Sequence, residues 1–108
     1  MYDALLSALQ AIGIPFQEYG WDQRPDVDYG LVSIDGAGEV VAADNHIQEQ
    51  AIEGTIDLFT HGNDRASMAA IQGILDGLEG CAWYLNSVQY EQETRLIHWE
   101  WVFQLEAM

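Results

Sequence analysis

The sequence contains no lysine, and its only basic residues are three arginines, Arg24, Arg65 and Arg95. Against them stand 18 aspartates and glutamates, which give a formal net charge of -15. A chain without a basic stripe cannot neutralise phosphates, so ordinary nucleic-acid binding by counterion release is excluded. An anionic membrane surface is expected to repel it. DNA can therefore be a neighbour of this chain, but we do not expect it to be a ligand.

Cysteine and long apolar runs are also scarce. Cys81 is the only cysteine, so no internal disulfide can form, and its apolar surroundings predict a small buried residue. No basic segment precedes the first apolar residues, and no apolar run reaches the length of a membrane span. We therefore expect a protein made in a reducing cytoplasm, with neither a signal peptide nor a membrane segment.

The apolar content is high enough to build a core. Hydrophobic residues make up 49% of the chain and aromatic residues 11%, which is more than an acidic disordered tail would carry. A chain of 108 residues is the size of one domain. We expect a single folded unit covering residues 1–108.

Hydrophobic periodicity predicts two helices and five strands. Apolar residues at helical spacing indicate one helix over 3–12 and a second that starts after a cap at Asn63 or Asp64 and ends near Gly77 or Gly80. Alternation of apolar and polar residues predicts the strands, most clearly the last, where Trp99, Trp101 and Phe103 share a face. The predicted strands cover 14–19, 29–35, 50–60, 81–90 and 94–105.

The resulting order is α-β-β-β-α-β-β, which predicts an α+β fold. Short connections between neighbouring strands favour a mainly antiparallel sheet, with the two helices on one face as the second layer of a two-layer sandwich. Residues 36–48 mix Gly-Ala-Gly with valines and polar residues. We interpret them as a long loop, which in a small domain is usually functional.

No motif for catalysis or for cofactor binding stands out. Eighteen carboxylates make chance pairs inevitable, and His46, Glu49, His61 and His98 lack a tight metal-ligand motif. There is no Gly-x-Ser-x-Gly elbow, Cys81 has no basic neighbour, and no lysine follows Gly36-Ala37-Gly38. We expect no enzyme activity, no cofactor and no metal site.

The aromatic residues near Arg24 suggest a binding surface instead. Tyr19, Trp21 and Tyr29 surround a polar turn that carries Arg24, and Tyr, Trp and Arg are the residues most enriched at binding hot spots. Arg24 can pair with a carboxylate of a neighbouring subunit or form an ordinary salt bridge within the monomer. We hypothesise a subunit or partner interface at these four residues and Arg95.

Six segments spread over nearly the whole chain resemble those of one protein class. They read Met-Tyr-Asp-Ala-Leu-Leu-Ser-Ala-Leu at 1–9, Ile-Pro-Phe at 14–16, Tyr-Gly-Trp at 19–21, Tyr-Gly-Leu-Val-Ser at 29–33, Gly-Thr-Ile-Asp-Leu-Phe at 54–59 and His-Trp-Glu-Trp-Val-Phe at 98–103. In these segments, in element order and in length, the chain resembles the tail-terminator, or tail-completion, proteins of long-tailed bacteriophages and prophages.

The resemblance implies a non-enzymatic virion protein at the head–tail junction, assembled in the cytoplasm of a bacterial host. Such proteins form a ring, commonly a hexamer, that caps the tail tube, stops its polymerisation and joins it to the head. Its partners would be other copies of itself, the major tail tube protein and a head-completion or connector protein. A ring this acidic would let DNA pass without binding it. Glu39, Asp44 and Glu49, in or beside the predicted loop, are candidates for its lumen or tube-facing surface.

Three alternatives stay open. Another phage neck or minor tail protein would have similar size and strand texture. An acidic DNA-mimic inhibitor would carry its carboxylates on one long face, whereas here they are dispersed through every predicted element. A small enzyme would need a deep polar cleft with shifted titratable groups.

Overall fold

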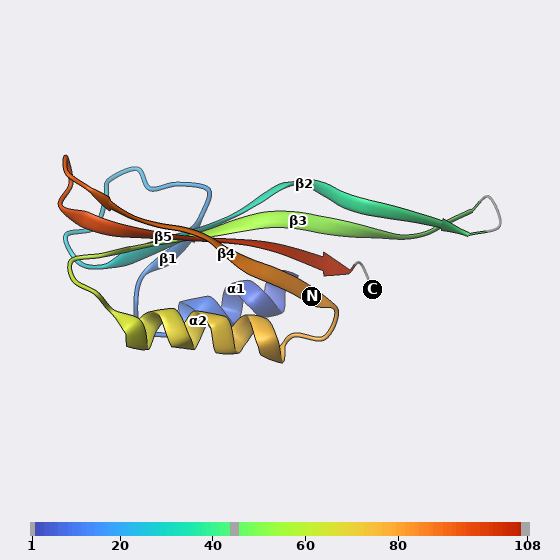
Figure 1. The fold of residues 1–108 in the computed structure, drawn as a ribbon, viewed down its shortest axis with the longest axis horizontal. Helices are drawn as coiled ribbons and strands as arrows, with labels where there is room; N and C mark the ends of the chain where they lie inside the picture. The colour runs from blue at the N-terminus through green and yellow to red at the C-terminus, as the bar shows by residue number, and fades with distance from the viewer. Residues whose placement is uncertain (1, 44–45, 107–108) are drawn as a thin grey trace.

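The computed structural model describes residues 2–43 and 46–106, with side chains outside 37–50. It contains the predicted order α-β-β-β-α-β-β, and the predicted fold class is confirmed (Figure 1). The elements are α1 (Tyr2–Gln10), β1 (Phe16–Glu18), β2 (Tyr29–Ala43), β3 (His46–Thr60), α2 (Arg65–Gly77), β4 (Cys81–Glu91) and β5 (Leu96–Glu106). No helix in this part of the chain is long and apolar enough to cross a membrane.

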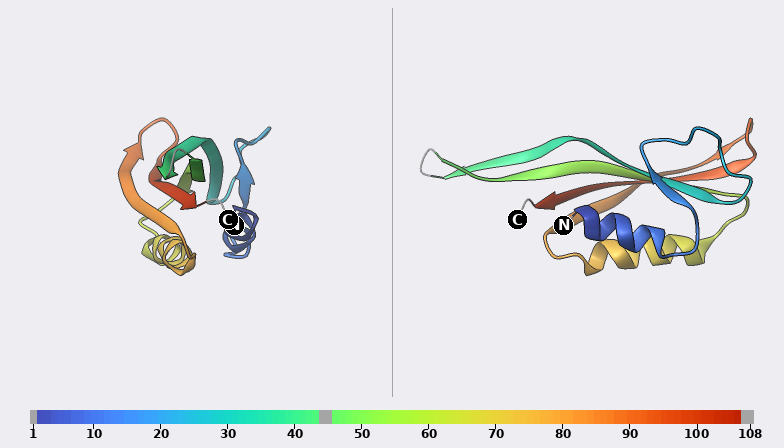
Figure 2. Two further views of the ribbon diagram at one scale, coloured as in Figure 1. Left: turned by 90° about the vertical axis from the view of Figure 1, so that its right-hand side faces the viewer. Right: turned by 180° about the vertical axis from the view of Figure 1, so that it is seen from behind.

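The strands form one five-stranded sheet in the order β1-β2-β3-β5-β4. The short β1 runs parallel to β2, and every other neighbouring pair is antiparallel. Both helices lie on the same face of the sheet (Figure 2). The opposite face is therefore free of helices, and the two edges of the sheet are the three-residue β1 and the eleven-residue β4.

The core lies between the sheet and the two helices. Strand alternation turns Trp101, Phe103 and Leu105 of β5 toward the helices, where they are almost completely buried. The two helices cover them with two buried residues each, Leu5 and Leu9 of α1 and Ile71 and Leu75 of α2. The predicted inward face of the last strand is confirmed, because period-two alternation over eleven residues leaves only one way to bury its aromatic side chains.

Gly54 lets the neighbouring chains approach closely in the middle of the sheet. A Cβ atom added there would lie 2.3 Å from the Ser33 carbonyl oxygen and 2.5 Å from the ring of Phe103. The Phe103 ring therefore occupies the space that a side chain on β3 would need, and glycine is the residue that fits.

The predicted long loop at 36–48 is wrong. Most of that segment belongs to β2 and β3, which continue past the end of β5 as a two-stranded arm (Figure 1) and give the molecule extents of 52 × 24 × 24 Å. The register of this hairpin shifts three times, between Ile34 and Gly36, between Ala37 and Val40, and between Val41 and Ala42. Each bulge inserts an extra residue and resets the alternation, which hides the strand pattern in the sequence.

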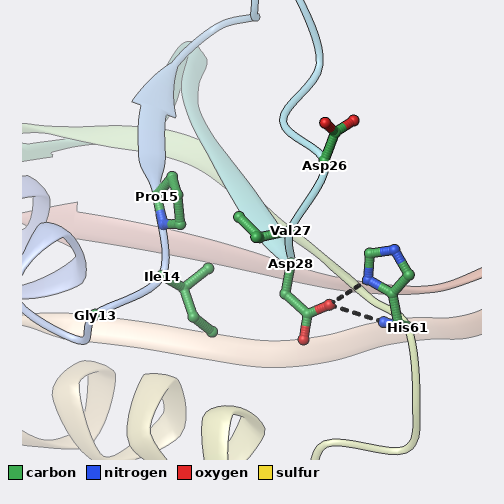
Figure 3. Close-up of a pocket in the computed structure, with 7 residues that line it drawn as sticks. All are labelled: Gly13, Ile14, Pro15, Asp26, Val27, Asp28 and His61. Atoms are coloured by element: carbon green, nitrogen blue, oxygen red, sulfur yellow. Dashed lines mark hydrogen bonds and ion pairs between the residues drawn. The ribbon is translucent and has the colours of Figure 1, made fainter.

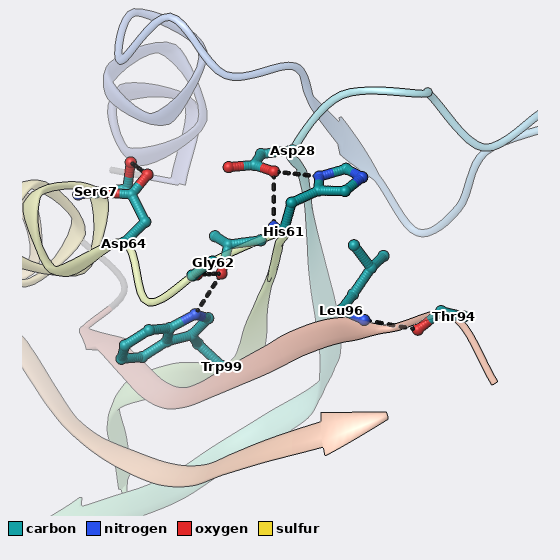
Figure 4. Close-up of polar contacts among 9 residues, drawn as sticks. Asp28, His61, Gly62, Asp64, Ser67, Thr94, Leu96 and Trp99 are labelled. Atoms are coloured by element: carbon teal, nitrogen blue, oxygen red, sulfur yellow. Dashed lines mark hydrogen bonds and ion pairs between the residues drawn. The ribbon is translucent and has the colours of Figure 1, made fainter. Parts of the chain in front are cut away.

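Asp64 caps α2, as one of the two predicted alternatives. Its Oδ1 accepts a hydrogen bond from the backbone N–H of Ser67 at 3.0 Å, and its Oδ2 accepts one from the Ser67 hydroxyl at 2.7 Å (Figure 4). These hydrogen bonds hold the pKa of the Asp64 carboxyl below its usual range. The cap fixes where α2 begins and thus where Arg65, its first residue, is presented.

Candidate functional site

Three connections meet at one end of the molecule, opposite the arm. They are the 19–28 loop, the 61–64 turn that leads into α2, and the 92–95 turn between β4 and β5 (Figure 1). The antiparallel strands bring them together, because β2, α2 and β5 all begin at this end while β3 and β4 finish there. Each connection carries or adjoins one arginine, so we call this the arginine end.

The three arginines of this end lie at the surface of the molecule. Arg24, Arg65 and Arg95 are all exposed. None of them forms an ion pair with a carboxylate whose side chain the structure describes. In that part of the chain, the basic residues that form ion pairs are His61 and His98. The salt bridge within the monomer that Arg24 was expected to form as one alternative is absent from this part of the chain.

Two residues of the predicted interface have an unusual backbone conformation. Tyr19 and Arg95 are the non-glycine residues with positive φ in the described chain, at 66° and 61°. This left-handed region disfavours residues with a side chain, most of all bulky ones such as tyrosine. Both are exposed, Tyr19 to 63%. Such strained positions concentrate at functional sites, and the interface predicted at these two residues stays a prediction.

Trp21 and Tyr29 support the loop from beneath. The rings of Trp21, Tyr29, Phe59 and His98 follow one another across the helix-free face, with centroid separations of 6.2, 4.8 and 4.4 Å. Trp21 donates its indole N–H to the Gly30 carbonyl at 3.3 Å. Tyr29 is only 7% exposed, and this burial raises the pKa of its hydroxyl although the Arg24 guanidinium nearby acts the other way. These two rings therefore hold the 19–28 loop in place, while Tyr19 and Arg24 of that loop are exposed.

The row of rings ends in a histidine among carboxylates. His98 Nε2 lies 2.6 Å from Asp57 Oδ1, and its Nδ1 lies 3.6 Å from a Glu91 oxygen. The hydrogen bond with Asp57 is the main reason why the pKa of His98 is raised, against the opposing effect of burial. A charged His98 offsets the repulsion between Asp57 and Glu100, which face each other across β3 and β5.

Sequence reasoning did not find this cluster. One ligand atom each from Asp57, His98 and Glu100 lie within 4.8 Å of one another, so these residues could hold a cation. The metal ligands considered from the sequence were His46, Glu49, His61 and His98. That set required a helical turn at His46 and Glu49, but both residues belong to strand β3. The signal that the sequence did contain is alternation, which places Asp57 and His98 on the outward faces of paired strands.

A shallow groove of about 550 Å³ opens beside the arginine end (Figure 3). Its apolar surface comes from Ile14, Pro15 and Val27, and its polar part comes from Asp26, Asp28 and His61. Asp28 Oδ1 accepts hydrogen bonds from the backbone N–H of His61 at 2.9 Å and lies 2.6 Å from its Nδ1. The Asp28–His61 contact ties the start of β2 to the end of β3 and positions the 61–64 turn.

The groove has one histidine, His61, and two aspartates, Asp26 and Asp28. None of the described residues that line it is serine, threonine or cysteine. Cys81 belongs to β4, and burial raises the pKa of its thiol, which keeps it protonated and poorly reactive.

Edge strand β4 offers a second surface that sequence reasoning missed. Tyr84, Leu85, Val88 and Tyr90 are four of the six large hydrophobic residues found exposed in the described part of the chain. The run from Gly80 to Tyr90 contains no charged residue, although soluble proteins usually protect open edges with charges. An uncharged run of this length in so acidic a chain was the sequence signal that could have revealed this surface.

The structure locates only part of the acidic surface predicted at Glu39, Asp44 and Glu49. Glu39 belongs to β2 and Glu49 to β3, where Glu49 pairs with Val41. Asp44 lies outside the described residues, and side-chain positions are described for neither glutamate. The structure therefore places the backbone of Glu39 and Glu49 on the arm, and the predicted lumen-facing role stays a prediction.

No protein-family model matches the chain, and no curated protein matches it. A solved chain described as "Virion of native gene transfer agent (GTA) particle" is similar in structure, with a TM-score of 0.55 at 14% sequence identity. The similarity covers 97% of this chain and 89% of that chain. What the two share is the fold.

Proposed function

We propose that this chain is a structural protein of a phage-like virion that forms a ring at the head–tail junction, caps the tail tube and joins the tail to the head. The observation that carries the proposal is the shared fold with a chain from a gene transfer agent virion, which extends over 97% of this chain. The resemblance of its sequence segments to tail-terminator proteins supports the finer role. We propose no catalytic activity for it.

The surface supports ring assembly. A ring closes through heterologous contacts, in which each copy uses two different patches. The arginine end and the uncharged edge of β4 are two such patches on one subunit. The net charge of -15 per copy suits a channel that DNA must traverse without adhering.

Tail assembly in a strain that lacks the gene tests this function. We expect electron micrographs to show abnormally long tubes and heads without tails, and a plasmid copy of the gene to restore normal tails. Tails of normal length would refute the tube-capping role. If those tails are not attached to heads, the chain is another neck protein. Normal tails attached to heads would refute the whole proposal.

Purified protein provides the complementary test. Added to polymerising tail tube protein from the same genome, it should shorten the tubes and be found at their ends. Unchanged tube length, with no protein at the ends, would contradict the capping role. Tight binding to a DNA-processing enzyme instead would favour the DNA-mimic alternative.

A further inference from the structure

Two carboxylates face each other on the helix-free face of the sheet. Asp57 of β3 is paired with Glu100 of β5 in the antiparallel ladder, and like charges directly opposite each other on neighbouring strands destabilise a sheet. Glu91 of β4 adds a third carboxylate, with an oxygen 3.6 Å from His98 Nδ1. None of the three forms an ion pair with an arginine in the part of the chain whose side chains are described. A proton on His98 offsets one of these three negative charges and leaves the other two.

Ligand atoms of three side chains converge at this place. One atom each from Asp57, His98 and Glu100 lie within 4.8 Å of one another, and His98 presents Nε2 to Asp57 Oδ1 at 2.6 Å. A tetrahedral Zn²⁺ ion with bonds of about 2.0–2.1 Å holds its ligand atoms roughly 3.3 Å apart. The three atoms therefore need only small shifts, which rotation of the side chains supplies. The side chains of Asp57 and His98 are 19% and 22% exposed, so water can reach the remaining coordination position.

His98 is held in the way that a metal-ligating histidine usually is. Its Nε2 is directed at the cluster, while its Nδ1 faces a Glu91 oxygen. Histidines that bind a metal commonly direct their second ring nitrogen to a carboxylate, which fixes the tautomer and the orientation of the ring. The Phe59 ring stacks on the imidazole at a centroid separation of 4.4 Å, and Thr94 donates its hydroxyl to the other Glu91 oxygen at 3.1 Å. The imidazole is thus oriented by residues that are not themselves ligands.

Glu100 is also held by a residue outside the cluster. Asn86 of β4 donates a side-chain N–H to Glu100 Oε1 at 2.6 Å. Asn86 lies at the register shift between Leu85 and Ser87, so an extra residue in β4 brings this donor to the carboxylate. Carboxylates that bind a metal are themselves hydrogen-bonded in this manner. One oxygen of Glu100 is therefore anchored, and the second can bind an ion.

A second histidine–aspartate pair in the described chain provides a contrast. His61 Nδ1 lies 2.6 Å from Asp28 Oδ1, but the His61 side chain is 60% exposed. Among the described residues, no group of three ligands includes His61. The two histidines make the same contact with an aspartate and differ in the presence of a further carboxylate ligand.

We propose that Asp57, His98 and Glu100 bind one Zn²⁺ ion, with water completing its coordination. One imidazole nitrogen and two carboxylate oxygens form a donor set that suits zinc. Ca²⁺ takes about six to eight oxygen ligands and Mg²⁺ requires an octahedron of oxygens, so three protein ligands that include a nitrogen match neither ion. The bound ion links β3 to β5 and compensates the carboxylates that face each other there. The sequence showed no short ligand motif because the ligands come from two separate strands, and the site does not depend on the proposed virion role.

Isothermal titration calorimetry with zinc chloride tests the site. In about 0.15 M salt, which screens exposed carboxylates, the wild type is expected to bind one Zn²⁺ ion per chain, and an equal concentration of Mg²⁺ should not compete. His98→Gln and Glu100→Gln should each weaken Zn²⁺ binding by about tenfold or more, because each removes a ligand. Glu100→Gln retains an oxygen that accepts the Asn86 hydrogen bond, so it should fold as the wild type does, which circular dichroism checks.

Matched variants outside the cluster provide the controls. His61→Gln and Glu93→Gln make the same two changes of residue type, and both should bind Zn²⁺ as the wild type does. Zinc chloride should also raise the melting temperature of the wild type and of both controls, because an ion that binds the folded state stabilises it. It should not raise the melting temperature of His98→Gln.

Three outcomes would overturn the zinc site. The first is a folded wild type that takes up no Zn²⁺, in which case His98 and Asp57 form an ordinary ion pair. The second is equal binding by the ligand variants and the controls. The third is uptake of several weakly bound ions that Mg²⁺ displaces, which would show that cations only screen the acidic surface.

Discussion

Thr60 and Trp99 form a buried link whose removal should have a measurable cost. Thr60 is fully buried at the end of β3, and Trp99 of β5 is 4% exposed. The indole N–H of Trp99 donates to Thr60 Oγ1 at 3.1 Å, and the Thr60 hydroxyl donates to the Gly62 carbonyl at 2.6 Å (Figure 4). The hydroxyl thus joins the sheet to the turn that leads into α2.

Thr60→Val keeps the shape of the side chain and removes the hydroxyl. The indole N–H of Trp99 would then be buried without an acceptor, which costs about 2 kcal/mol of unfolding free energy. The exposed Gly62 carbonyl can bind water instead, so its loss adds little. Thermal unfolding followed by circular dichroism should show a melting temperature lower by roughly 10 °C for a chain of this size.

Two further variants isolate the hydrogen bond. Thr60→Ser keeps the hydroxyl and removes one methyl group, which should cost about 1 kcal/mol. In a Trp99→Phe background the donor is absent, so Thr60→Val should cost about 1 kcal/mol less than it does in the wild type. An equal cost of Thr60→Val in both backgrounds would refute the reasoning, because the indole would then not depend on the hydroxyl.

Two other predictions concern the sheet. His98→Gln should lose the stabilisation that the charged imidazole gives to the folded state. The pKa of His98 is raised in the folded state. The stabilisation is therefore fully present below the unfolded pKa of about 6.5, and it disappears as pH rises through the folded pKa. Urea titrations across pH should show the two proteins converging at high pH, and a pH-independent difference would contradict this. Gly54→Ala should destabilise by roughly 2 kcal/mol or more, because its Cβ would meet the Ser33 carbonyl; wild-type urea stability would show that the strands can move apart.

The sequence predicted the elements wherever alternation or helical spacing ran without interruption. The last strand is the clearest case, because Trp99, Trp101 and Phe103 alternate with polar residues and are buried as expected. The helix cap was narrowed to two adjacent residues, since only a short polar side chain can accept the free N–H groups of a first turn. Each of these signals depends on residues that are close together in the sequence, so it can be recognised without the tertiary structure.

The hairpin arm was missed because its pairing is irregular. Three register shifts between Ile34 and Ala42 break the period of two that identifies a strand. Sequence alone could not show that β3 would supply a partner along its full length. The pairing depends on two segments that meet only after folding.

The interface predicted around Arg24 stays a prediction, and the structure gives the positions of its residues. Composition and clustering pointed to Tyr19, Arg24 and Arg95, and all three are exposed. Arg24 and Arg95 belong to connections at the arginine end, whereas Tyr19 follows β1 and donates its backbone N–H to the Val32 carbonyl further along the sheet. Tyr29 was grouped with them because it is near Arg24 in the sequence, yet it is buried under the loop against Phe59. Arg65 was not included, because no aromatic neighbour in the sequence marked it.

The sequence by itself determined the charge of -15, the absence of lysine and the order of helices and strands, because these follow from composition and from periodicity along the chain. Tertiary structure decided where the few cations lie. Arg24, Arg65 and Arg95 are far apart in the sequence, and they share one end only because antiparallel strands return the chain there three times.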